Sequence, residues 1–369
     1  MPEQRELATY VLPFTKLESL QVEVSNICNL ECKRCFIHLE NNKLSLFPKS
    51  LWDEKIHPVL NQIKNISLVG IGEPLLCKDF FYFVEDSVKH NIVVSATSNL
   101  QLVNEEIAEE IVTSGVTELS FSCDGGTKET YENIRINGNF EKLLKSLDLI
   151  NKFKAKYNSP TPRLILNFGA LRSNIDEFPQ VILLADKYKI NAIIAYHFVT
   201  YYADLKDDSL FHYQELSDHR FVEAKRRADK LGIEMFLPGL FSRPLKYIPR
   251  GAYCPYPFTH LYVYGDGRIG PCCMDFPDRY VLGDINHSTL SQVWNSKEIL
   301  MLRKTLCTAP SNTCRYCVNH LKMDISNPKH FFRFKGSGEY IAGIKERSDR
   351  WKEIYGELVP IHREHSIFK

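Results

Sequence analysis

The sequence has no long uninterrupted apolar run and almost no net charge. Its 46 Lys and Arg residues balance 45 Asp and Glu residues, which leaves a formal net charge of +1. This balance argues against a nucleic-acid backbone or an anionic membrane surface as the main partner. No stretch approaches the roughly 18 apolar residues of a membrane span, and the first residues do not have the layout of a secretory signal. We therefore expect a cytoplasmic protein that binds neither nucleic acid nor membrane.

The chain also contains no internal repeats, low-complexity tracts or heptads. Its composition, 44% hydrophobic and 25% charged residues, excludes wholesale disorder and allows a large core. A length of 369 residues predicts two or three domains, at roughly 150 residues each.

Cysteine, in contrast, is abundant. A reducing cytoplasm disfavours a framework of disulfides, so the 11 cysteines indicate metal binding or catalysis. They are also unevenly distributed, because only two of them stand apart from two clusters. The first cluster is Cys28, Cys32 and Cys35, the second is Cys254, Cys272, Cys273, Cys307, Cys314 and Cys317, and the isolated residues are Cys77 and Cys123.

From about residue 17 to residue 198, short β-branched runs alternate with longer amphipathic segments. The predicted strands are 20–24, 66–69, 92–96, 118–122, 164–168 and 192–196, and the predicted helices are 78–90, 105–114, 138–157 and 177–189. Six βα units at this spacing predict an α/β fold, in which helices cover the outer face of a parallel sheet. The reactive site of such a fold lies at the carboxyl ends of the strands, where the first cysteines fall.

The amino-acid composition changes in the second half of the chain. Residues 209–232 predict a polar helix, and the proline-containing stretch 238–251 predicts a linker. Residues 252–321 are dense in Cys, Gly, Asp and aromatics, with a hairpin signal at Tyr264-Gly-Asp-Gly267. A unit of about 70 residues often needs a metal to hold it together. The charged and aromatic tail 327–369 predicts one helix and little else.

The first cysteine cluster has CX3CX2C spacing on a loop after a strand. Three thiolates suit three corners of a [4Fe–4S] cubane and leave one iron open to an outside ligand. The competing interpretation is a zinc site completed by His38, the one further Cys or His nearby.

Together with the motifs that follow it, this cluster resembles the radical SAM superfamily. The resemblance implies a partial (β/α)6 barrel in which Cys28, Cys32 and Cys35 hold the cluster and its open iron binds S-adenosylmethionine (SAM). Val69-Gly-Ile-Gly-Glu-Pro-Leu-Leu76 resembles the glycine-rich segment after the second strand, and Arg135 matches a position that pairs with the SAM carboxylate. The predicted SAM-binding residues are Gly70, Gly72, Glu73, Pro74, Ser98, Asn99, Ser122, Asp124, Arg135 and Asn167.

The chain departs from the family pattern at two places. Arg34 stands where the family usually has an aromatic residue close to the adenine, and Phe36 follows the third cysteine instead. Ile71 replaces the first glycine of the common GGEP form. Both departures affect the expected contacts to SAM and leave the cluster ligands intact.

The second cysteine cluster allows either an auxiliary [4Fe–4S] cluster or a zinc ribbon, since paired cysteines on hairpins suit both. The order Cys254, Gly267-X4-Cys272 and Cys314-X2-Cys317, with Val293-Trp-Asn295 between them, is similar to the SPASM/twitch extensions of radical SAM enzymes. The resemblance implies one auxiliary [4Fe–4S] cluster with Cys254, Cys272, Cys314 and Cys317 as ligands. It also implies a radical SAM core at residues 15–235, an auxiliary domain at 250–322 and a tail at 323–369.

The other cysteines have different expected roles. We interpret Cys77 and Cys123 as small buried hydrophobic residues. Cys273 and Cys307 are candidate hydrogen-atom donors, which would make the enzyme an epimerase, although either could instead be a cluster ligand and Cys273 could simply pack. At the end of the sixth strand, Tyr196 and His197 are expected to face the active-site rim, with His197 as a substrate contact.

The resemblance implies a radical SAM oxidoreductase-type enzyme. Such enzymes reductively cleave SAM to a 5′-deoxyadenosyl radical, which abstracts a hydrogen atom from the substrate, and they receive electrons from a donor such as flavodoxin or ferredoxin. Only 27 residues precede Cys28, so we expect a small-molecule or sugar-type intermediate of natural-product biosynthesis as substrate. The alternatives are a ribosomal peptide maturase, which crosslinks or epimerises a peptide substrate, and a non-enzymatic zinc-binding module.

Overall fold

A ten-stranded sheet dominates the computed structural model, which describes residues 7–35, 37, 44–242, 254–273, 280–306, 314 and 332–336. The strand order is β11-β10-β9-β1-β2-β3-β4-β5-β6-β8. Every pairing from β9 to β8 is parallel, and the pairings of β10 with β9 and β11 are antiparallel. The strands of this sheet are β1 (Ser19–Val22), β2 (Asn65–Leu68), β3 (Val93–Ser98), β4 (Glu118–Ser122), β5 (Arg163–Ala170), β6 (Ala192–His197), β8 (Glu234–Phe236), β9 (His260–Val263), β10 (Arg268–Gly270) and β11 (Gly283–Asp284).

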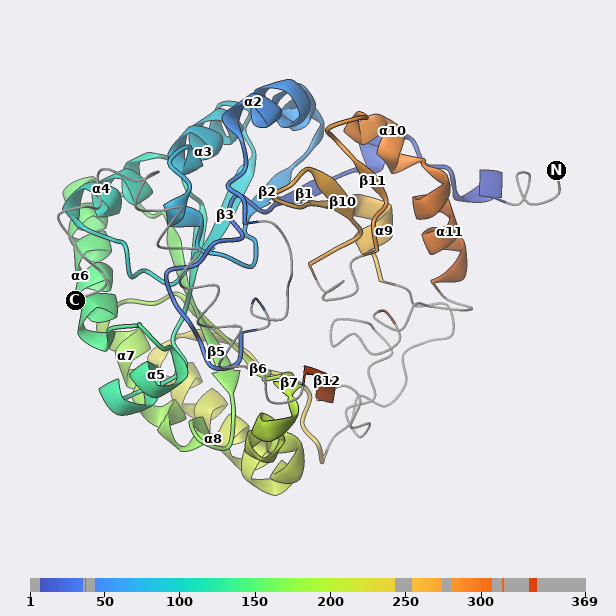
Figure 1. Ribbon diagram of the computed structural model, residues 1–369. Coiled ribbons are helices and arrows are strands. Elements are labelled where there is room, and N and C mark those ends of the chain that lie inside the picture. Colours follow the sequence, from blue (N-terminus) through green and yellow to red (C-terminus); the bar gives the residue numbers. More distant parts are fainter. Residues whose placement is uncertain are drawn as a thin grey trace.

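Helices form a ring outside the parallel strands, so that the sheet curves into an open barrel (Figure 1). Alternate side chains of the strands and one face of each helix enter a continuous hydrophobic core, as expected for a parallel sheet covered by helices. The main helices are α3 (Phe80–Lys89), α4 (Glu105–Thr113), α5 (Lys128–Ile134), α6 (Phe140–Lys156), α7 (Phe178–Lys187), α8 (Gln214–Leu231), α9 (Tyr256–Thr259), α10 (Leu290–Trp294) and α11 (Lys297–Thr305). None of the helices in the described part of the chain is long and apolar enough to cross a membrane.

The predicted α/β fold is confirmed, because β1 to β6 coincide with the six strands expected from the sequence. The four predicted crossover helices correspond to α3, α4, α6 and α7. The predicted polar helix is shorter than expected: α8 begins at Gln214 and ends at Leu231, and Gly232 caps it in a left-handed conformation with φ of 70°.

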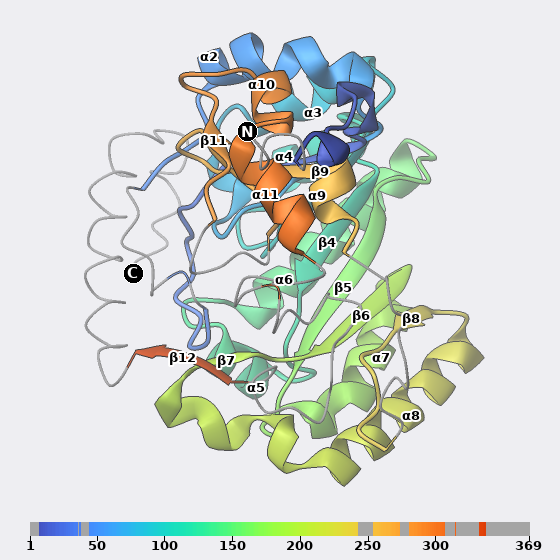
Figure 2. The ribbon, with the colours of Figure 1, turned by 90° about the vertical axis from the view of Figure 1, so that its right-hand side faces the viewer.

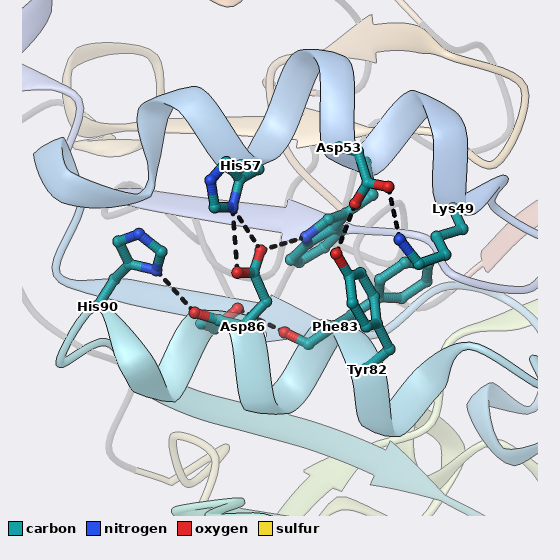
Figure 3. Close-up of polar contacts among 9 residues, drawn as sticks. Lys49, Asp53, His57, Tyr82, Phe83, Asp86 and His90 are labelled. Carbon is teal, nitrogen blue, oxygen red and sulfur yellow. Dashed lines mark hydrogen bonds and ion pairs between the residues drawn. The ribbon is translucent and has the colours of Figure 1, made fainter.

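A polar cluster fastens the first crossover to the barrel (Figure 3). The buried carboxylate of Asp86 on α3 accepts a hydrogen bond from Trp52 Nε1 at 2.8 Å and lies 2.9 Å from His57 Nδ1. The backbone carbonyl of Asp86 accepts from His90 Nδ1 at 2.7 Å, and the Trp52 ring stacks on Phe83 with centroids 4.4 Å apart. Trp52 and His57 therefore hold the segment before β2 against α3, whereas His90 bonds the end of α3 itself.

The C-terminal hairpin continues the barrel sheet. The sequence predicted this hairpin, and β9 and β10 confirm it, with a turn that places Gly267 at a φ of 92°. Because β9 pairs with β1 over four residues, the cysteine-rich region packs directly beside the barrel (Figure 2). The proposed domain boundary between the two remains a prediction.

The same region anchors the segment that precedes β1. Trp294 is fully buried and donates from Nε1 to Pro13 O at 3.1 Å, and Asn295 exchanges two hydrogen bonds with the backbone of Leu12. Arg303 stacks on Trp294, with its guanidinium 4.4 Å from the ring centroid, and donates to Tyr10 O. Trp294 and Asn295 thus have a structural role.

A second, two-stranded sheet pairs β7 (Thr200–Tyr202) with β12 (Phe332–Gly336), which comes from the C-terminal tail. This parallel pair brings the tail to the chain segment that follows β6 (Figure 1). The helix predicted for residues 327–369 lies outside the described residues, and so does most of the predicted linker.

Candidate active site

The CX3CX2C loop begins just beyond the carboxyl end of β1, as the sequence predicted. Its three thiols are half-buried. Two backbone hydrogen bonds tie the start of the loop to the turn after β2: Gly72 N–H donates to Ser25 O at 3.1 Å, and Glu73 N–H donates to Ile27 O at 2.7 Å. The glycine-rich turn therefore forms one wall of the cysteine loop.

The two glycines of this turn are required by close packing. A Cβ on Gly72 would lie 2.3 Å from Ile27 O and 2.7 Å from Ser25 O, and a Cβ on Gly70 would lie 2.2 Å from the Cγ of Glu23. Any larger residue at position 72 would push the cysteine-loop backbone away, because carbonyl oxygens of the main chain cannot move aside as a flexible side chain can.

Glu73 fixes the relative position of two strand ends. Its buried carboxylate accepts hydrogen bonds from Ser98 Oγ at 2.7 Å, Asn99 N–H at 2.7 Å and Leu75 N–H at 3.2 Å. Burial raises the pKa of Glu73 to about 7, although these three donors oppose the shift. Three of the predicted SAM-binding residues, Glu73, Ser98 and Asn99, thus form one hydrogen-bonded group. Pro74, also predicted to bind SAM, is the first residue of the short 3₁₀ helix that follows Glu73.

Asn99 connects this group to the first cysteine. Its Nδ2 donates to Asn29 Oδ1 at 2.8 Å and lies 3.8 Å from Cys28 Sγ. A backbone donor, Leu30 N–H, also points at Cys28 Sγ from 3.4 Å. Donors to sulfur of this kind are usual around thiolates that ligate metal clusters.

The opposite side of the cysteine loop is bonded to the segment that follows α5. Glu31 N–H donates to Ile136 O at 3.0 Å, and Lys33 N–H donates to Ile134 O at 3.1 Å. These two bonds flank Cys32 on one strand of the pairing and Arg135 on the other. Arg135 therefore comes to the cysteine loop through backbone pairing that the sequence alone does not reveal.

Arg135 forms an ion pair with Asp124 at the end of β4. Its Nε and Nη2 donate to Asp124 Oδ2 at 2.7 Å and 2.5 Å, and its Nη1 lies 3.7 Å from Cys32 Sγ. The other carboxylate oxygen of Asp124 accepts from Gly169 N–H at 2.8 Å. The expected role of Arg135 at the SAM carboxylate remains a prediction.

The three thiols share one electrostatic environment, and this is the observation on which the fit of an iron–sulfur cluster depends. Burial raises the pKa of Cys28, and the neighbouring Cys32, Glu73 and Cys35 raise it further. Burial also raises the pKa of Cys32, while Arg135 opposes the shift. A cubane takes one thiolate at each of several separate irons, so its ligands need not surround a single metal ion. Three thiols on one loop, two of them supplied with N–H donors, fit the cubane.

The remaining predicted cleft residues lie on neighbouring strand ends. Ser122 on β4 and Asn167 on β5 are direct partners in the sheet register, and both are partly exposed. Tyr196 on β6 is 39% exposed and faces the same side, and the charges of Asp124, Arg135 and the cysteines affect the pKa of its hydroxyl. Burial and the adjacent Asp124 raise the pKa of Tyr196 above its usual value.

His197 does not face the active-site rim, which corrects the sequence-based expectation. Side chains alternate along a strand, so His197 points to the opposite face from Tyr196. There its Nε2 lies 3.0 Å from Ser217 Oγ of α8, and its ring packs against Phe221 and Phe241. Burial lowers the pKa of His197 to about 4.

The structure describes only part of the second cysteine cluster. Cys254 precedes α9, Cys272 follows β10, and both are half-buried, as is Cys314. Cys273 is exposed. The predicted ligand Cys317 and the candidate hydrogen donor Cys307 lie outside the described residues, so the auxiliary ligand set remains a prediction.

Cys77 and Cys123 are buried, as expected for packing residues. Burial raises the pKa of each thiol to about 12, and Cys123 Sγ donates to Gly125 O at 3.3 Å.

Sequence reasoning missed three polar residues that hold the site together. Asn29 bonds Asn99, as described above. Glu177 caps the start of α5 by accepting from Gly126 N–H and Thr127 N–H, and Asp208 forms an ion pair with Arg34 in the cysteine loop. Asp208 and Glu177 are distant in sequence from the groups they bind, and no local motif marks them.

Two family models match this chain. One, described as the radical SAM superfamily, matches residues 22–182, and the other, described as an iron–sulfur cluster-binding domain (SPASM), matches residues 254–318. A probable GTP 3′,8-cyclase of Methanocaldococcus jannaschii is 28% identical over 273 residues, which cover 70% of this chain and 86% of that protein. A cysteine-type anaerobic sulfatase-maturating enzyme of Clostridium novyi is 24% identical over 312 residues, 76% of this chain and 79% of that enzyme.

The fold is similar to that of Streptococcus suis SuiB bound to its precursor peptide SuiA. The TM-score is 0.64 at 17% sequence identity, and the match covers 80% of this chain and 68% of SuiB. The two matched domains bind a [4Fe–4S] cluster with SAM and auxiliary iron–sulfur clusters. The chain belongs to the radical SAM superfamily and carries a C-terminal SPASM domain.

Proposed function

We propose that this enzyme cleaves SAM reductively and abstracts a hydrogen atom from an organic substrate, with Cys28, Cys32 and Cys35 as the ligands of its SAM-binding cluster. The observation that carries this proposal is the double clamp on the cysteine loop. One side is bonded to the glycine-rich turn and the other to the segment around Arg135, so both sides of the loop that carries the three thiols are held at the carboxyl ends of the strands. When bound, the cluster and SAM supply the electron and the hydrogen-abstracting group.

The residues of the chain prepare the place where SAM would bind. Gly70 and Gly72 allow close backbone approach, and Glu73, Ser98 and Asn99 fix the strand ends through their mutual hydrogen bonds. The other residues that we assign to the SAM cleft are Pro74, Ser122, Asp124, Arg135 and Asn167. Tyr196, on the neighbouring strand, is the side chain best placed to contact a substrate from the same side.

We infer a peptide as the substrate class. The support comes from relatives: SuiB is recorded with a precursor peptide, and another relative matures sulfatases. One relative, matched over 86% of its own length, is named for a nucleotide substrate, so the nucleotide class is the alternative to test. The described residues offer no support for the sugar-type substrate expected from the sequence.

Anaerobic incubation with SAM and dithionite tests the reaction. We expect 5′-deoxyadenosine from the wild-type enzyme and none from Cys32→Ala. Metal analysis should give about four iron and four sulfide per cluster. Zinc without sulfide, and no 5′-deoxyadenosine, would instead support the non-enzymatic zinc-binding module.

The substrate class can be tested by adding either GTP or peptides encoded beside the gene to the same reaction. A peptide substrate predicts that one of the peptides changes in mass or, for an isomeric product, in chromatographic retention, while GTP changes in neither. If the peptide product is an epimer, deuterium from the solvent should enter it. Turnover should then be lost, with SAM cleavage retained, in Cys273→Ala or Cys307→Ala.

A further inference from the structure

Of the described hydrogen bonds to the cluster thiols, only one comes from a charged donor. The Nη1 of Arg135 lies 3.7 Å from Cys32 Sγ, and the Arg135 side chain is only 15% exposed. The two donors at Cys28 Sγ, Leu30 N–H and the amide of Asn99, are neutral. The protein therefore places a shielded positive charge against one particular thiol.

This guanidinium is held in place by Asp124. Two of its nitrogens donate to Asp124 Oδ2 at 2.7 Å and 2.5 Å, and the carboxylate is 2% exposed. Gly169 N–H on β5 donates to the second oxygen at 2.8 Å, which ties the carboxylate to the sheet. Nη1 is consequently directed at Cys32 by the fold itself.

Cys32 is fixed just as firmly. The residues on either side of it donate backbone hydrogen bonds to Ile134 O and Ile136 O, at 3.1 Å and 3.0 Å. The same pairing places Arg135 opposite Cys32. Both partners are thus immobilised by main-chain bonds as well as by their own contact.

Hydrogen bonds to sulfur and nearby charge are among the factors that set the reduction potential of an iron–sulfur cluster. Reduction adds an electron, so a fixed cation at a ligand sulfur stabilises the reduced state and a fixed anion destabilises it. Where water is excluded, such charges act more strongly than in solution. Arg135 and Asp124 act in opposite directions, and the guanidinium is the nearer of the two to the sulfur.

We propose that the Asp124–Arg135 pair sets the reduction potential of the cluster on Cys28, Cys32 and Cys35 by means of the bond to Cys32. This inference rests on the proposed function, since it requires that cluster. It gives Arg135 a positioning and tuning role that exists before SAM binds.

The test is an anaerobic redox titration of the intact enzyme without SAM, followed by electron paramagnetic resonance. The Cys32→Ala variant, which should lack the SAM-binding cluster, identifies the signal of that cluster. We expect Arg135→Gln to shift its midpoint potential to more negative values and Asp124→Asn to shift it to more positive values. Arg172→Gln is the matched control, because this exposed arginine pairs with Asp176 on the surface. The control should not shift, and in every variant the auxiliary cluster should keep its potential.

A second variant covers the case in which Arg135→Gln does not assemble the cluster. Arg135→Lys keeps the charge but cannot bond Asp124 and Cys32 together, so we expect a smaller shift in the same direction. Unchanged potentials in whichever of these variants assemble the cluster would overturn the proposal, and weaker SAM binding at unchanged potential would assign Arg135 to the SAM carboxylate instead. If the wild-type enzyme itself shows no [4Fe–4S] signal that responds to SAM, the proposed function fails rather than this inference.

Discussion

At the scale of single residues, the site depends on two backbone segments that lie closer together than a side chain between them would permit. Gly72 is the clearest case, because the missing side chain leaves room for the carbonyl oxygens of Ser25 and Ile27. These oxygens accept the hydrogen bonds that hold the start of the cysteine loop. The geometry of the cluster ligands thus depends on a residue that contacts no cofactor through a side chain.

We expect Gly72→Ala to reduce the iron content of the first cluster and to destabilise the fold by about 1–3 kcal/mol, the usual cost of overpacking. Gly232→Ala is the control, since its φ of 70° strains alanine but no atom lies within 4 Å of a new Cβ. The control should lose about 1 kcal/mol and keep its iron. Iron analysis and urea unfolding measure both effects, and equal iron loss in the two variants would contradict the local explanation.

Two buried histidines predict how stability depends on pH. Burial lowers the pKa of His197 and of His260 to about 4. Between pH 4 and the ordinary value near 6.5, the unfolded chain therefore binds more protons than the folded chain. Stability should be fully present above pH 6.5 and should be lost progressively as the pH falls towards 4.

The measurement is anaerobic urea unfolding at pH 7.5 and pH 5.5. Each buried histidine should contribute a loss of about 1 kcal/mol over this interval, and Glu73 should offset part of the total, because its raised pKa makes the folded chain bind a proton that the unfolded chain does not. His260→Gln removes one of the two groups and should lose correspondingly less, whereas the exposed His219→Gln should behave as the wild type does. Equal losses in wild type and His260→Gln would show that His260 contributes nothing.

At the scale of elements, α11 anchors the N-terminal segment through one arginine. Arg303 is 2% exposed, and its guanidinium lies over Trp294 while donating to Pro257 O at 2.8 Å and Tyr10 O at 3.1 Å. In the described part of the chain no carboxylate pairs with Arg303, so carbonyl and amide oxygens accept its hydrogen bonds. Burial accordingly lowers its pKa to about 10.

Arg303→Lys should destabilise the protein by about 2–4 kcal/mol, because a single ammonium cannot replace the spread of donors of a buried guanidinium. Hydrogen exchange should rise first in residues 8–16, which these bonds hold. Lys297→Ala changes an exposed residue of the same helix and should leave both readouts unchanged. Unaltered exchange in residues 8–16 of Arg303→Lys would show that other contacts anchor the segment.

At the scale of the whole molecule, the barrel and the cysteine-rich region share one sheet. β9 pairs with β1 along its whole length, and its residues Leu261 and Val263 are fully buried. Without β9, the first strand of the barrel would become an unprotected apolar edge, which favours aggregation. The C-terminal region therefore completes the barrel as well as carrying cysteines.

Truncation tests this dependence. A chain of residues 1–242 should aggregate or unfold without a cooperative transition, whereas a chain of residues 1–306 keeps all ten strands and should fold with the first cluster. Circular dichroism, urea unfolding and iron analysis distinguish the two. A cooperative, iron-containing chain 1–242 would show that the barrel is independent of the hairpin.

The sequence by itself determined the βα alternation, the order of the motifs and the spacing of the three cysteines on the loop after β1. These features are local: strand periodicity, cysteine spacing and the Tyr264–Gly267 turn are each written within a few neighbouring residues. Strands β1 to β6 and the family membership followed from them. Even so, local pattern misplaced His197, because alternation along β6 gave one residue to the cleft and the next to α8.

Only the tertiary structure decided which polar groups meet. Arg135 reaches Cys32, Asp208 reaches Arg34 and Trp294 reaches Pro13 across separations of 103, 174 and 281 residues, and no local signal records such pairings. The pairing of β9 with β1 is another example. The sequence of a strand indicates which of its faces is buried, but not which strand it pairs with. The physical reason is that hydrogen bonds and ion pairs are satisfied in space, by whichever partner the packing of the core brings within reach.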